Sequence, residues 1–516
     1  MTESIPKQPK QRAESADFFL TDHLRADLGA RTARGGAVTI VSHSLRFVIT
    51  IAATSVMARL LKPADYGLIG MVAFFTNFVA LFKDLGLSVA TIQKSEISRA
   101  QVSTLFWLNV GFSVAVTGVM IVFSPFVAWF YGDQRLIAVT AVTAAGFLLG
   151  GLTVQHEALL RRQMRFFSLV SILLISTVVG YVVGIFMAWR GFSYWALVFS
   201  QLALLFTNTV GVWLACRWRP GLPKRNSGVR SMVTFGGNFT GFSIINYFSR
   251  NIDSLLLGKV WGANQLGLYN RAYQLMTLPI EQVNEPITSV AIPALSRMKD
   301  EPQAYRQAYL RMLEKIAMCT MPAVAFMMAT SDWIVQVVLG SQWSATSRIF
   351  LLLGITGLFQ PIANTTGWLF LTQGRSRHML HWGFISGPLT VASIIVGLPW
   401  GVVGVAASYA FTRVLLTDPL LFWFVGRTGP VRTRDLYRTI APFTLASLLA
   451  LAVAYAVRTL FVFHNPIVGL IALFLTTGAV TLLCLGALPA GRLALTDIRK
   501  TVALILKQRQ EAVLVR

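Results

Sequence analysis

The chain has 516 residues, of which 55% are hydrophobic and only 13% are charged. A soluble domain is usually about one quarter charged, so this much apolar surface does not fit a water-soluble core. Apolar runs of roughly 20 residues, the length that crosses a bilayer as helix, recur along the whole chain. The composition therefore predicts an all-α polytopic membrane protein and excludes outer-membrane barrels, whose strands alternate in short segments.

Fourteen transmembrane helices are predicted from these runs. They cover residues 36–58, 67–90, 103–127, 137–156, 168–189, 193–215, 231–250, 269–293, 313–330, 347–371, 379–398, 402–424, 438–457 and 466–489. The longest predicted outer connections, 251–268 and 330–346, have only about 17 residues.

The net charge of +24 follows from the predicted topology. Lys and Arg gather in the N-terminal arm, in alternate connections and in the C-terminal tail, whereas the other connections hold few. The positive-inside rule then places both termini in the cytoplasm. No fold or aromatic-basic motif supports nucleic-acid binding, so no nucleic-acid partner is expected.

Metal, cofactor and hydrolase signatures are absent from the sequence. Cys216, Cys319 and Cys484 lie far apart, so no disulfide or zinc framework follows. There is no G-x-x-x-x-G-K-[ST], H-E-x-x-H or G-x-S-x-G motif. We expect no metal, no cofactor and no catalytic residue, which favours a transporter over an enzyme.

A weak internal repeat divides the chain. Gly67-Leu68 in the stretch 57–69 corresponds to Gly267-Leu268 in the stretch 247–273, and 191–197 resembles 401–407 at an offset of 210. Parallel repeats of this kind commonly build transporters with a site between the halves. The alternative is that Gly and aromatic residues simply recur at many span ends. The repeat predicts a cytosolic arm (1–35), an N-lobe of spans 1–6 (36–215), a basic linker (216–230), a C-lobe of spans 7–12 (231–424), spans 13–14 with their preceding loop (425–489) and an amphipathic cytoplasmic tail (490–516).

Polar residues form stripes on four predicted spans, where ionisable groups cost roughly 2.5–3.5 kcal/mol each at a span centre. The stripes include Arg46 in span 1, Asn246 and Arg250 in span 7, and Arg413 in span 12. Stripes at intervals of three or four residues imply a shared aqueous cavity. Arg250 and Asp253, at i and i+3, either face that cavity or neutralise each other at the outer end of span 7.

Span 8 combines acids with prolines. Pro279, Pro286 and Pro293 recur every seven residues and predict a kinked helix. Glu281 and Glu285 either exchange a proton or sodium ion during transport or neutralise arginines across the cavity. Asp253 and Asp84 are the further ion-coupling candidates.

The ordered motifs resemble the Wzx-type flippases, the polysaccharide-transporter family of the MOP (multidrug/oligosaccharidyl-lipid/polysaccharide) exporter superfamily, in their WzxC-like form. The matching stretches are 58–68 (ARLLKPADYGL), 84–87, 162–166, 194–197, 235–236, 249–253 (SRNID), 267–273 (GLYNRAY), 292–297 (IPALSR) and 401–404. Glu281 and Glu285 are not part of this pattern.

The resemblance implies a V-shaped, two-lobed fold and a substrate. Such a flippase moves a polyprenyl-diphosphate-linked oligosaccharide, of the undecaprenyl type, from the cytoplasmic to the periplasmic face for exopolysaccharide or lipopolysaccharide synthesis. Polymerase and chain-length or export proteins are then possible partners, beside membrane lipids. A diphosphate needs cations, and arginine is suited to phosphate by its planar fork. The substrate-cavity candidates are Arg46, Arg250, Arg271, Arg413, Asn246 and Asn364.

Two rival functions are less consistent with the sequence. A multidrug exporter of the same superfamily, or another small-molecule antiporter, would carry cationic drugs and favour an acidic or aromatic cavity over one lined with arginine. A membrane polymerase or glycosyltransferase generally needs a large periplasmic loop, and the predicted connections are too short for one.

Overall fold

The computed structural model describes the backbone of residues 28–80, 91, 97–223, 230–489, 491–492 and 496. Within these residues, the side chains of 28–41, 230–246, Ser249, Ser376 and Thr428 are outside the description. The described part is helical and contains no strand. Its contacts divide the chain into two compact units, 1–267 and 268–516. The predicted all-α membrane fold is confirmed.

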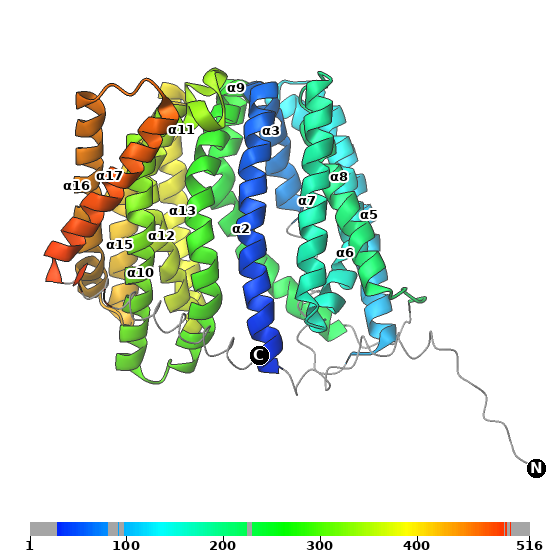
Figure 1. The fold of residues 1–516 in the computed structure, drawn as a ribbon. Helices are drawn as coiled ribbons and strands as arrows, with labels where there is room; N and C mark the ends of the chain where they lie inside the picture. The colour runs from blue at the N-terminus through cyan, green and yellow to red at the C-terminus, as the bar shows by residue number, and fades with distance from the viewer. Residues whose placement is uncertain are drawn as a thin grey trace, which may run out of the picture. The chain divides into compact units, whose positions relative to one another are not determined.

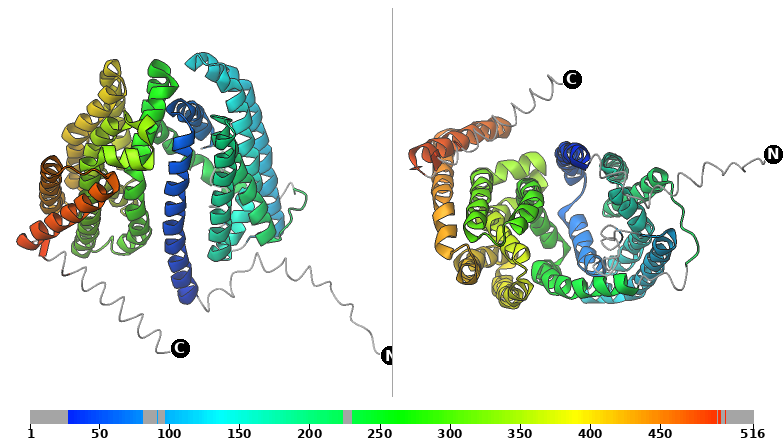
Figure 2. Two further views of the ribbon diagram at one scale, coloured as in Figure 1. Left: turned by 45° about the horizontal axis from the view of Figure 1, so that its top comes forward. Right: turned by 90° about the horizontal axis from the view of Figure 1, so that it is seen from below.

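The N-terminal unit is built from antiparallel helices (Figure 1). Helix α7 packs along α8, α5 along α6, and α2 along α7, which Figure 2 shows from two further directions. The helices are α2 (Leu28–Leu60), α3 (Pro63–Ala80), α5 (Arg99–Tyr131), α6 (Arg135–Arg162), α7 (Phe166–Trp189), α8 (Trp195–Cys216) and the part of α9 (Arg230–Arg297) that ends at Gly267.

Small residues let these helices approach closely. A Cβ atom at Gly151 of α6 would lie 2.3 Å from the Ser113 hydroxyl of α5, and one at Gly180 of α7 would lie 2.9 Å from a Ser200 carbonyl of α8. Membrane helices lack a hydrophobic force that drives them together, so close packing of small residues stabilises their pairing.

Helices α2 and α3 form a sharp corner. Residues 42–60 and 63–80 are bent by 117° relative to each other. Pro63 occupies the first position of α3, where its missing N–H costs nothing, and an Asp65 carboxylate oxygen accepts the backbone N–H of Lys62 at 2.8 Å. The motif 62–67 thus starts a new helix directly after the previous one ends.

Helix α9 corrects the predicted connection between spans 7 and 8. Residues 230–297 comprise two helices that meet at a kink at Gly262 (φ 76°, ψ −179°). The predicted connection 251–268 contains the break between the two helices, but the residues on both sides of the break are helical. The charged side chains of Asp253 and Lys259 end the apolar run but do not end the helix, and the left-handed φ of Gly262 makes the kink.

The C-terminal unit surrounds a central helix. Helix α12 packs against α10, α11, α13, α14 and α15. Two buried hydroxyl pairs fix α10 on α12, namely Tyr309 with Thr365 at 2.8 Å and Tyr305 with Thr372 at 2.6 Å. The helices are α10 (Pro302–Ala329), α11 (Ser331–Val338), η2 (Ser341–Trp343), α12 (Thr346–Thr372), α13 (Ser376–Gly397), η3 (Leu398–Trp400), α14 (Gly401–Thr412), η4 (Arg413–Thr417), α15 (Asp418–Thr428), α16 (Thr433–Leu460) and α17 (Pro466–Ala487).

The last two helices dock on the outside of this unit. Helix α16 packs on α10 and α17, and α17 contacts α10 and α11. Arg458 of α16 donates to the Ala329 carbonyl at 2.8 Å and to an Asp332 carboxylate oxygen at 2.7 Å. Its guanidinium lies 4.5 Å from the centre of the Trp333 ring, so one arginine ties α16 to the turn between α10 and α11.

The described residues of the predicted spans fall largely on helix, but residues 81–90 of the predicted span 67–90 lie outside the description, and the number of separate crossings is not confirmed. Within the described ranges, nine helical segments are long and apolar enough to cross a membrane, or ten if the bent pair of α2 and α3 counts as one. The predicted spans 7 and 8 share the single element α9, and the predicted connection 330–346 contains α11 and η2. Helix α2 begins at Leu28, inside the predicted arm 1–35, and the predicted tail lies almost entirely outside the described residues.

Candidate functional site

The N-terminal unit carries two arginines in the middle of helices. Arg46 lies near the centre of α2, and Arg250 lies inside the first half of α9, not at its end as predicted. Both side chains are exposed, and neither forms a hydrogen bond or ion pair among the described residues. A guanidinium at this depth needs water or an anion beside it.

The predicted pair of Arg250 and Asp253 does not form. Asp253 is half-buried, and one of its carboxylate oxygens accepts the N–H of Ser254 at 2.7 Å. Tyr247, one turn before Arg250, donates its hydroxyl to the Phe74 carbonyl of α3 at 2.6 Å. Arg250 therefore keeps its donors available. The predicted Asn246 lies on α9, but its side chain is outside the described residues, as is the whole of Asp84.

The second half of α9 presents a polar face in the C-terminal unit. Arg271 is half-buried and donates to the Gln274 side-chain oxygen one turn later. Glu281 and Glu285 are exposed and lie one turn apart, so their charges are neighbours. The Asn284 side-chain oxygen is buried without a hydrogen-bond partner among the described groups.

Arg413 has a partner that the sequence reading missed. Its Nε donates to an Asp418 carboxylate oxygen at 2.9 Å, and its Nη1 donates to the Tyr409 hydroxyl at 3.3 Å. The Asp418 side chain is only 4% exposed. Residues i and i+5 do not face each other on an α-helix, but 413–417 form a π-helical turn, which brings them together. The Tyr273 phenol of α9 also lies near enough to interact with the Arg413 charge.

Asn364 is exposed on α12, most of whose neighbouring residues are buried in the C-terminal unit. One turn earlier, the Gln360 side-chain oxygen is buried without a hydrogen-bond partner in the described part of the chain. Met276 of α9 contacts the position where a Cβ of Gly357 would be, at 3.1 Å from its sulfur. Asn364 and Gln360 thus form a polar row on α12, the helix that Met276 of α9 contacts.

Family motifs meet at one corner of the N-terminal unit. Asp65, in the stretch 58–68, accepts a hydrogen bond from the hydroxyl of Ser193, which precedes the motif 194–197. Nearby, Arg135 pairs with Asp133 at 2.7 Å in the turn between α5 and α6, and its guanidinium lies 6.0 Å from the Tyr194 ring centre. The hydrogen bond from Arg135 lowers the pKa of Asp133. These motif residues hold the corner of α2 and α3 in place.

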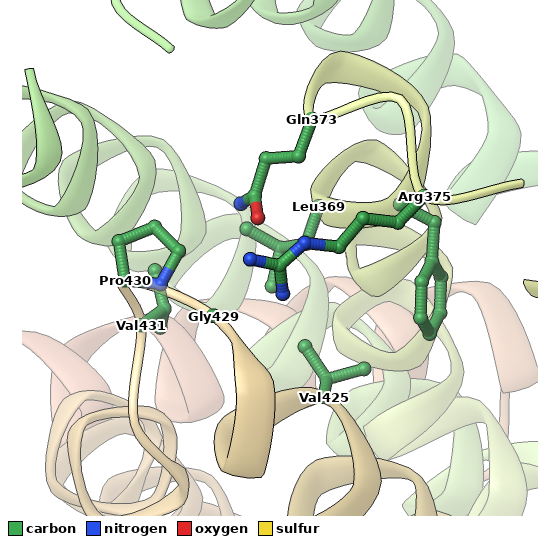
Figure 3. A pocket seen from close by; sticks show the side chains of 8 residues that line it. Leu369, Gln373, Arg375, Val425, Gly429, Pro430 and Val431 are labelled. Carbon is green, nitrogen blue, oxygen red and sulfur yellow. The ribbon is translucent and has the colours of Figure 1, made fainter. Parts of the chain in front are cut away.

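A small pocket lies at the C-terminal ends of α12 and α15 (Figure 3). Gln373 and Arg375 point into it, and the Arg375 guanidinium has no hydrogen-bond or ionic partner among the described residues. The Gln373 amide nitrogen is buried without a partner there. The other lining residues are Leu369, Phe370, Val425, Gly429, Pro430 and Val431. By the charge rule, this end of the unit is the predicted cytoplasmic end.

A buried polar row runs between α5 and α6. The side chains of Asn109 and Ser113 on α5 are buried, and their polar atoms have no hydrogen-bond partner in the described chain. Of the described His, Cys, Asp and Glu residues, no three are grouped as a metal would need. Sequence reasoning missed this row because Ser and Asn in apolar runs are not distinctive.

Comparison with known proteins settles the family. Residues 56–348, more than half of the chain, match the model of the family described as "Polysaccharide biosynthesis protein". The chain belongs to this polysaccharide biosynthesis family. It is 29% identical over 353 residues to the teichuronic acid biosynthesis protein TuaB of Bacillus subtilis, covering 67% of this chain and 72% of that one. It is 24% identical over 405 residues to the lipopolysaccharide biosynthesis protein WzxC of Escherichia coli, covering 77% and 81%. The predicted resemblance is confirmed.

Solved structures support the fold. The lipid II flippase MurJ, in an inward closed conformation, superposes with a TM-score of 0.69 at 13% identity and covers 86% of this chain and 97% of its own. An inward-facing MATE multidrug transporter of the MOP superfamily gives a TM-score of 0.56 at 15% identity, covering 76% and 96%. The family member thus has the fold of the MOP superfamily.

Proposed function

We propose that this protein is a flippase that moves a polyprenyl-diphosphate-linked oligosaccharide from the cytoplasmic to the periplasmic face of the bacterial inner membrane. Membership of the polysaccharide biosynthesis family supports the glycan as cargo. The name of one relative, the probable low-salt glycan biosynthesis flippase Agl15 of Haloferax volcanii, supports the type of transport.

The observation that carries the proposal is the pair of unneutralised arginines Arg46 and Arg250. A sugar headgroup cannot cross hydrocarbon, so it needs a polar path, and its diphosphate needs cations along that path. Two exposed guanidiniums in mid-helix, without an acidic partner among the described residues, supply them. Each offers five N–H donors in a planar fork, which suits a phosphate better than a lysine does.

Arg271, Arg413, Asn246 and Asn364 take secondary roles in this proposal. Arg413 is already neutralised by Asp418, and Arg271 donates to Gln274. They present amide and guanidinium groups that recognise sugar hydroxyls, whereas Arg46 and Arg250 hold the diphosphate. The lipid tail stays in the bilayer while the two repeats alternate in access.

The energy for outward movement comes in part from the membrane potential. An inside-negative potential favours export of an anion by about 2.3 kcal/mol per charge per 100 mV. Exchange of a proton or sodium ion at Glu281, Glu285, Asp253 or Asp84 adds to this drive. Glu281 and Glu285 are exposed carboxylates one turn apart on α9, so a coupling ion could reach both of them.

The experiment is the sidedness of the lipid-linked oligosaccharide in cells that lack the protein. Spheroplasts and lysed cells are treated with an impermeant sugar-modifying enzyme. We expect the lipid-linked unit to accumulate and to be modified only after lysis. Equal modification in intact spheroplasts would show that translocation does not need this protein, and would favour the multidrug exporter.

Complementation with variants then locates the anion site. Arg46→Ala and Arg250→Ala should fail to restore modification in intact spheroplasts, and Arg46→Lys should restore part of it. Arg190→Ala is the matched control, because Arg190 stacks on Trp189 and Phe186 at the end of α7. Full restoration by Arg46→Ala and Arg250→Ala would exclude these residues as the diphosphate site.

A further inference from the structure

Helices α3 and α9 are in direct backbone contact at two glycines, Gly67 and Gly267. A Cβ atom at Gly67 would lie 1.6 Å from the carbonyl oxygen of Ala263. A Cβ atom at Gly267 would lie 1.9 Å from the carbonyl oxygen of Pro63. No side chain fits at either position unless the helices move apart. We call this contact the glycine crossing.

The glycine crossing is reciprocal and follows the sequence repeat. Pro63 and Gly67 of the first repeat correspond to Ala263 and Gly267 of the second, at the offset of 200 that links Gly67 with Gly267. Each repeat offers one carbonyl and accepts one glycine from the other, as in a contact around a two-fold axis. The breaks before the two segments, the corner at 61–62 and the kink at Gly262, also correspond. The repeat thus encodes this contact.

The contact continues from the glycine crossing along α3. Gly258 of α9 faces Met71, with 3.3 Å between its Cβ position and the Met71 Cγ, and further along Tyr247 bonds to the Phe74 carbonyl at 2.6 Å. Arg250 lies between Tyr247 and Gly258 on the same helix. The charge rule places the start of α3 at the outer face, so the glycine crossing lies outward of Arg250.

We propose that the glycine crossing is the outer seal of the translocation path, closed in this structure, and that it must separate for a glycan to leave. The proposal rests on the flippase function proposed above. If the glycan passes between the two repeats, backbone in van der Waals contact leaves no room for a sugar ring. Contacts between Cα–H groups and carbonyls contribute only about 0.5–1 kcal/mol each, so they suit a joint that opens and recloses.

Glycine serves this joint because no side chain has to be reordered when it recloses. Ordering a long side chain costs up to about 2 kcal/mol of side-chain conformational entropy, whereas glycine has no side-chain entropy to lose. Opening has further costs, because the Tyr247 hydroxyl is bonded to the Phe74 carbonyl of α3 and Lys259 is bonded to the Phe130 carbonyl of the neighbouring helix α5. The contact between α3 and α9 is therefore weak at the glycine crossing and stronger toward the middle of α3, where Tyr247 bonds to Phe74.

Disulfide trapping tests the proposal. In a variant without native cysteines, Met71→Cys and Gly258→Cys form the test pair, because the Cβ position of Gly258 lies 3.3 Å from the Met71 Cγ, the atom whose place the sulfur of a cysteine would take. We expect oxidation to form the bond in membranes and to stop translocation, and reduction to restore it. Transport that continues with the bond fully formed would overturn the proposal, as would failure of the bond to form while the control pair forms its own.

Ile172→Cys with Gly211→Cys is the matched control. It joins α7 and α8 of the same unit, where a Cβ at Gly211 would lie 3.4 Å from the Ile172 Cβ. This pair should crosslink without stopping transport, because α7 and α8 stay packed in one repeat. If the control stops transport too, the block does not report on the seal, and the wedge variant below decides.

The wedge variant needs no substrate. Gly267→Val forces α3 and α9 apart, so a cysteine at Arg250→Cys should react faster with an impermeant maleimide added from outside than it does with Gly267 intact. Gly211→Val, between α7 and α8, is the control and should leave the rate unchanged. An unchanged rate with Gly267→Val would refute the seal. Faster labelling with no effect of protein loss on sidedness would instead leave the seal standing and refute the flippase function.

Discussion

The arginines of the two units have different partners. In the N-terminal unit, Arg46 and Arg250 are exposed and pair with nothing among the described residues. In the C-terminal unit, Arg413 pairs with Asp418 and Arg458 pairs with Asp332. A paired arginine holds helices together, whereas an unpaired arginine in mid-helix is free to bind an anion. The same residue type thus serves stability at Arg413 and Arg458 and, in the function proposed above, recognition at Arg46 and Arg250.

The largest effect on stability is expected at the buried ion pair of Arg413 and Asp418. Arg413→Ala leaves the Asp418 carboxylate buried without its cation, which typically costs about 3–5 kcal/mol of unfolding free energy. Thermal unfolding of the purified protein in detergent measures the loss. The control is Arg413→Met with Asp418→Leu, which removes both charges and should recover most of the stability. A stable Arg413→Ala protein would show that the pair is not structural.

The next effect is expected on transport alone. Arg46→Ala and Arg250→Ala each remove a charge-assisted hydrogen bond worth about 1.5–3 kcal/mol, so flipping should fall by roughly 10- to 100-fold. Thermal unfolding should stay within about 0.5 kcal/mol of the parent, because these side chains are exposed. Sidedness assays and melting curves on the same variants separate the two effects. Loss of stability in place of transport would make these arginines structural.

A smaller loss of stability is expected at Arg458, the second arginine that is paired with an acidic residue. Arg458→Met removes its bonds to Ala329 and Asp332 but keeps apolar contact with Trp333. Both charges are partly exposed, so we expect a loss of about 1 kcal/mol. Limited proteolysis at the connection 461–465 reports whether α16 loosens, and Arg458→Lys should behave in between. Equal protease resistance of all three proteins would show that packing alone docks α16.

The smallest effect is expected at the exposed pair in the turn after α5. The pKa of Asp133 is lowered by Arg135, so the pair stabilises the fold above the ordinary pKa of aspartate and this contribution is lost as the pH falls through the lowered value. Asp133→Asn should therefore cost less than about 1 kcal/mol near pH 7 and nothing in strong acid. Melting curves at both pH values check the difference, and a cost that persists in acid would contradict it.

Sequence patterns located the helices better than the contacts between them. Apolar length marks a crossing, so the described residues of the predicted spans fall largely on helix. Asp253 and Lys259 end the apolar run but not the helix, which continues to the kink at Gly262, so the sequence did not predict that the connection 251–268 is helical. The domain boundaries at 216–230 and 425 remain predictions, since the first half of α9 packs with the preceding helices.

The sequence predicted which residues would form the candidate site, but not which of them would pair with each other. Mid-span arginines are costly, and that cost identified Arg46, Arg250 and Arg413. The spacing of Arg250 and Asp253 suggested a pair that the structure lacks, because three-residue spacing permits contact without requiring it. The partner of Arg413 could not be found from helical spacing, because Asp418 is five residues away and only a local change of helix type aligns the two.

That local change has a consequence for the length of the chain. A π-helical turn accommodates one residue more than an α-helix would at the same place. Deleting a single residue, such as Leu415, would let residues 413–417 return to α-helix. The residues after the deletion would keep nearly the same direction around the helix axis, because the wider π turn already takes up the extra residue. A variant of this kind loses no charged group, and it should keep Arg413 and Asp418 paired at the ordinary α-helical spacing of four residues.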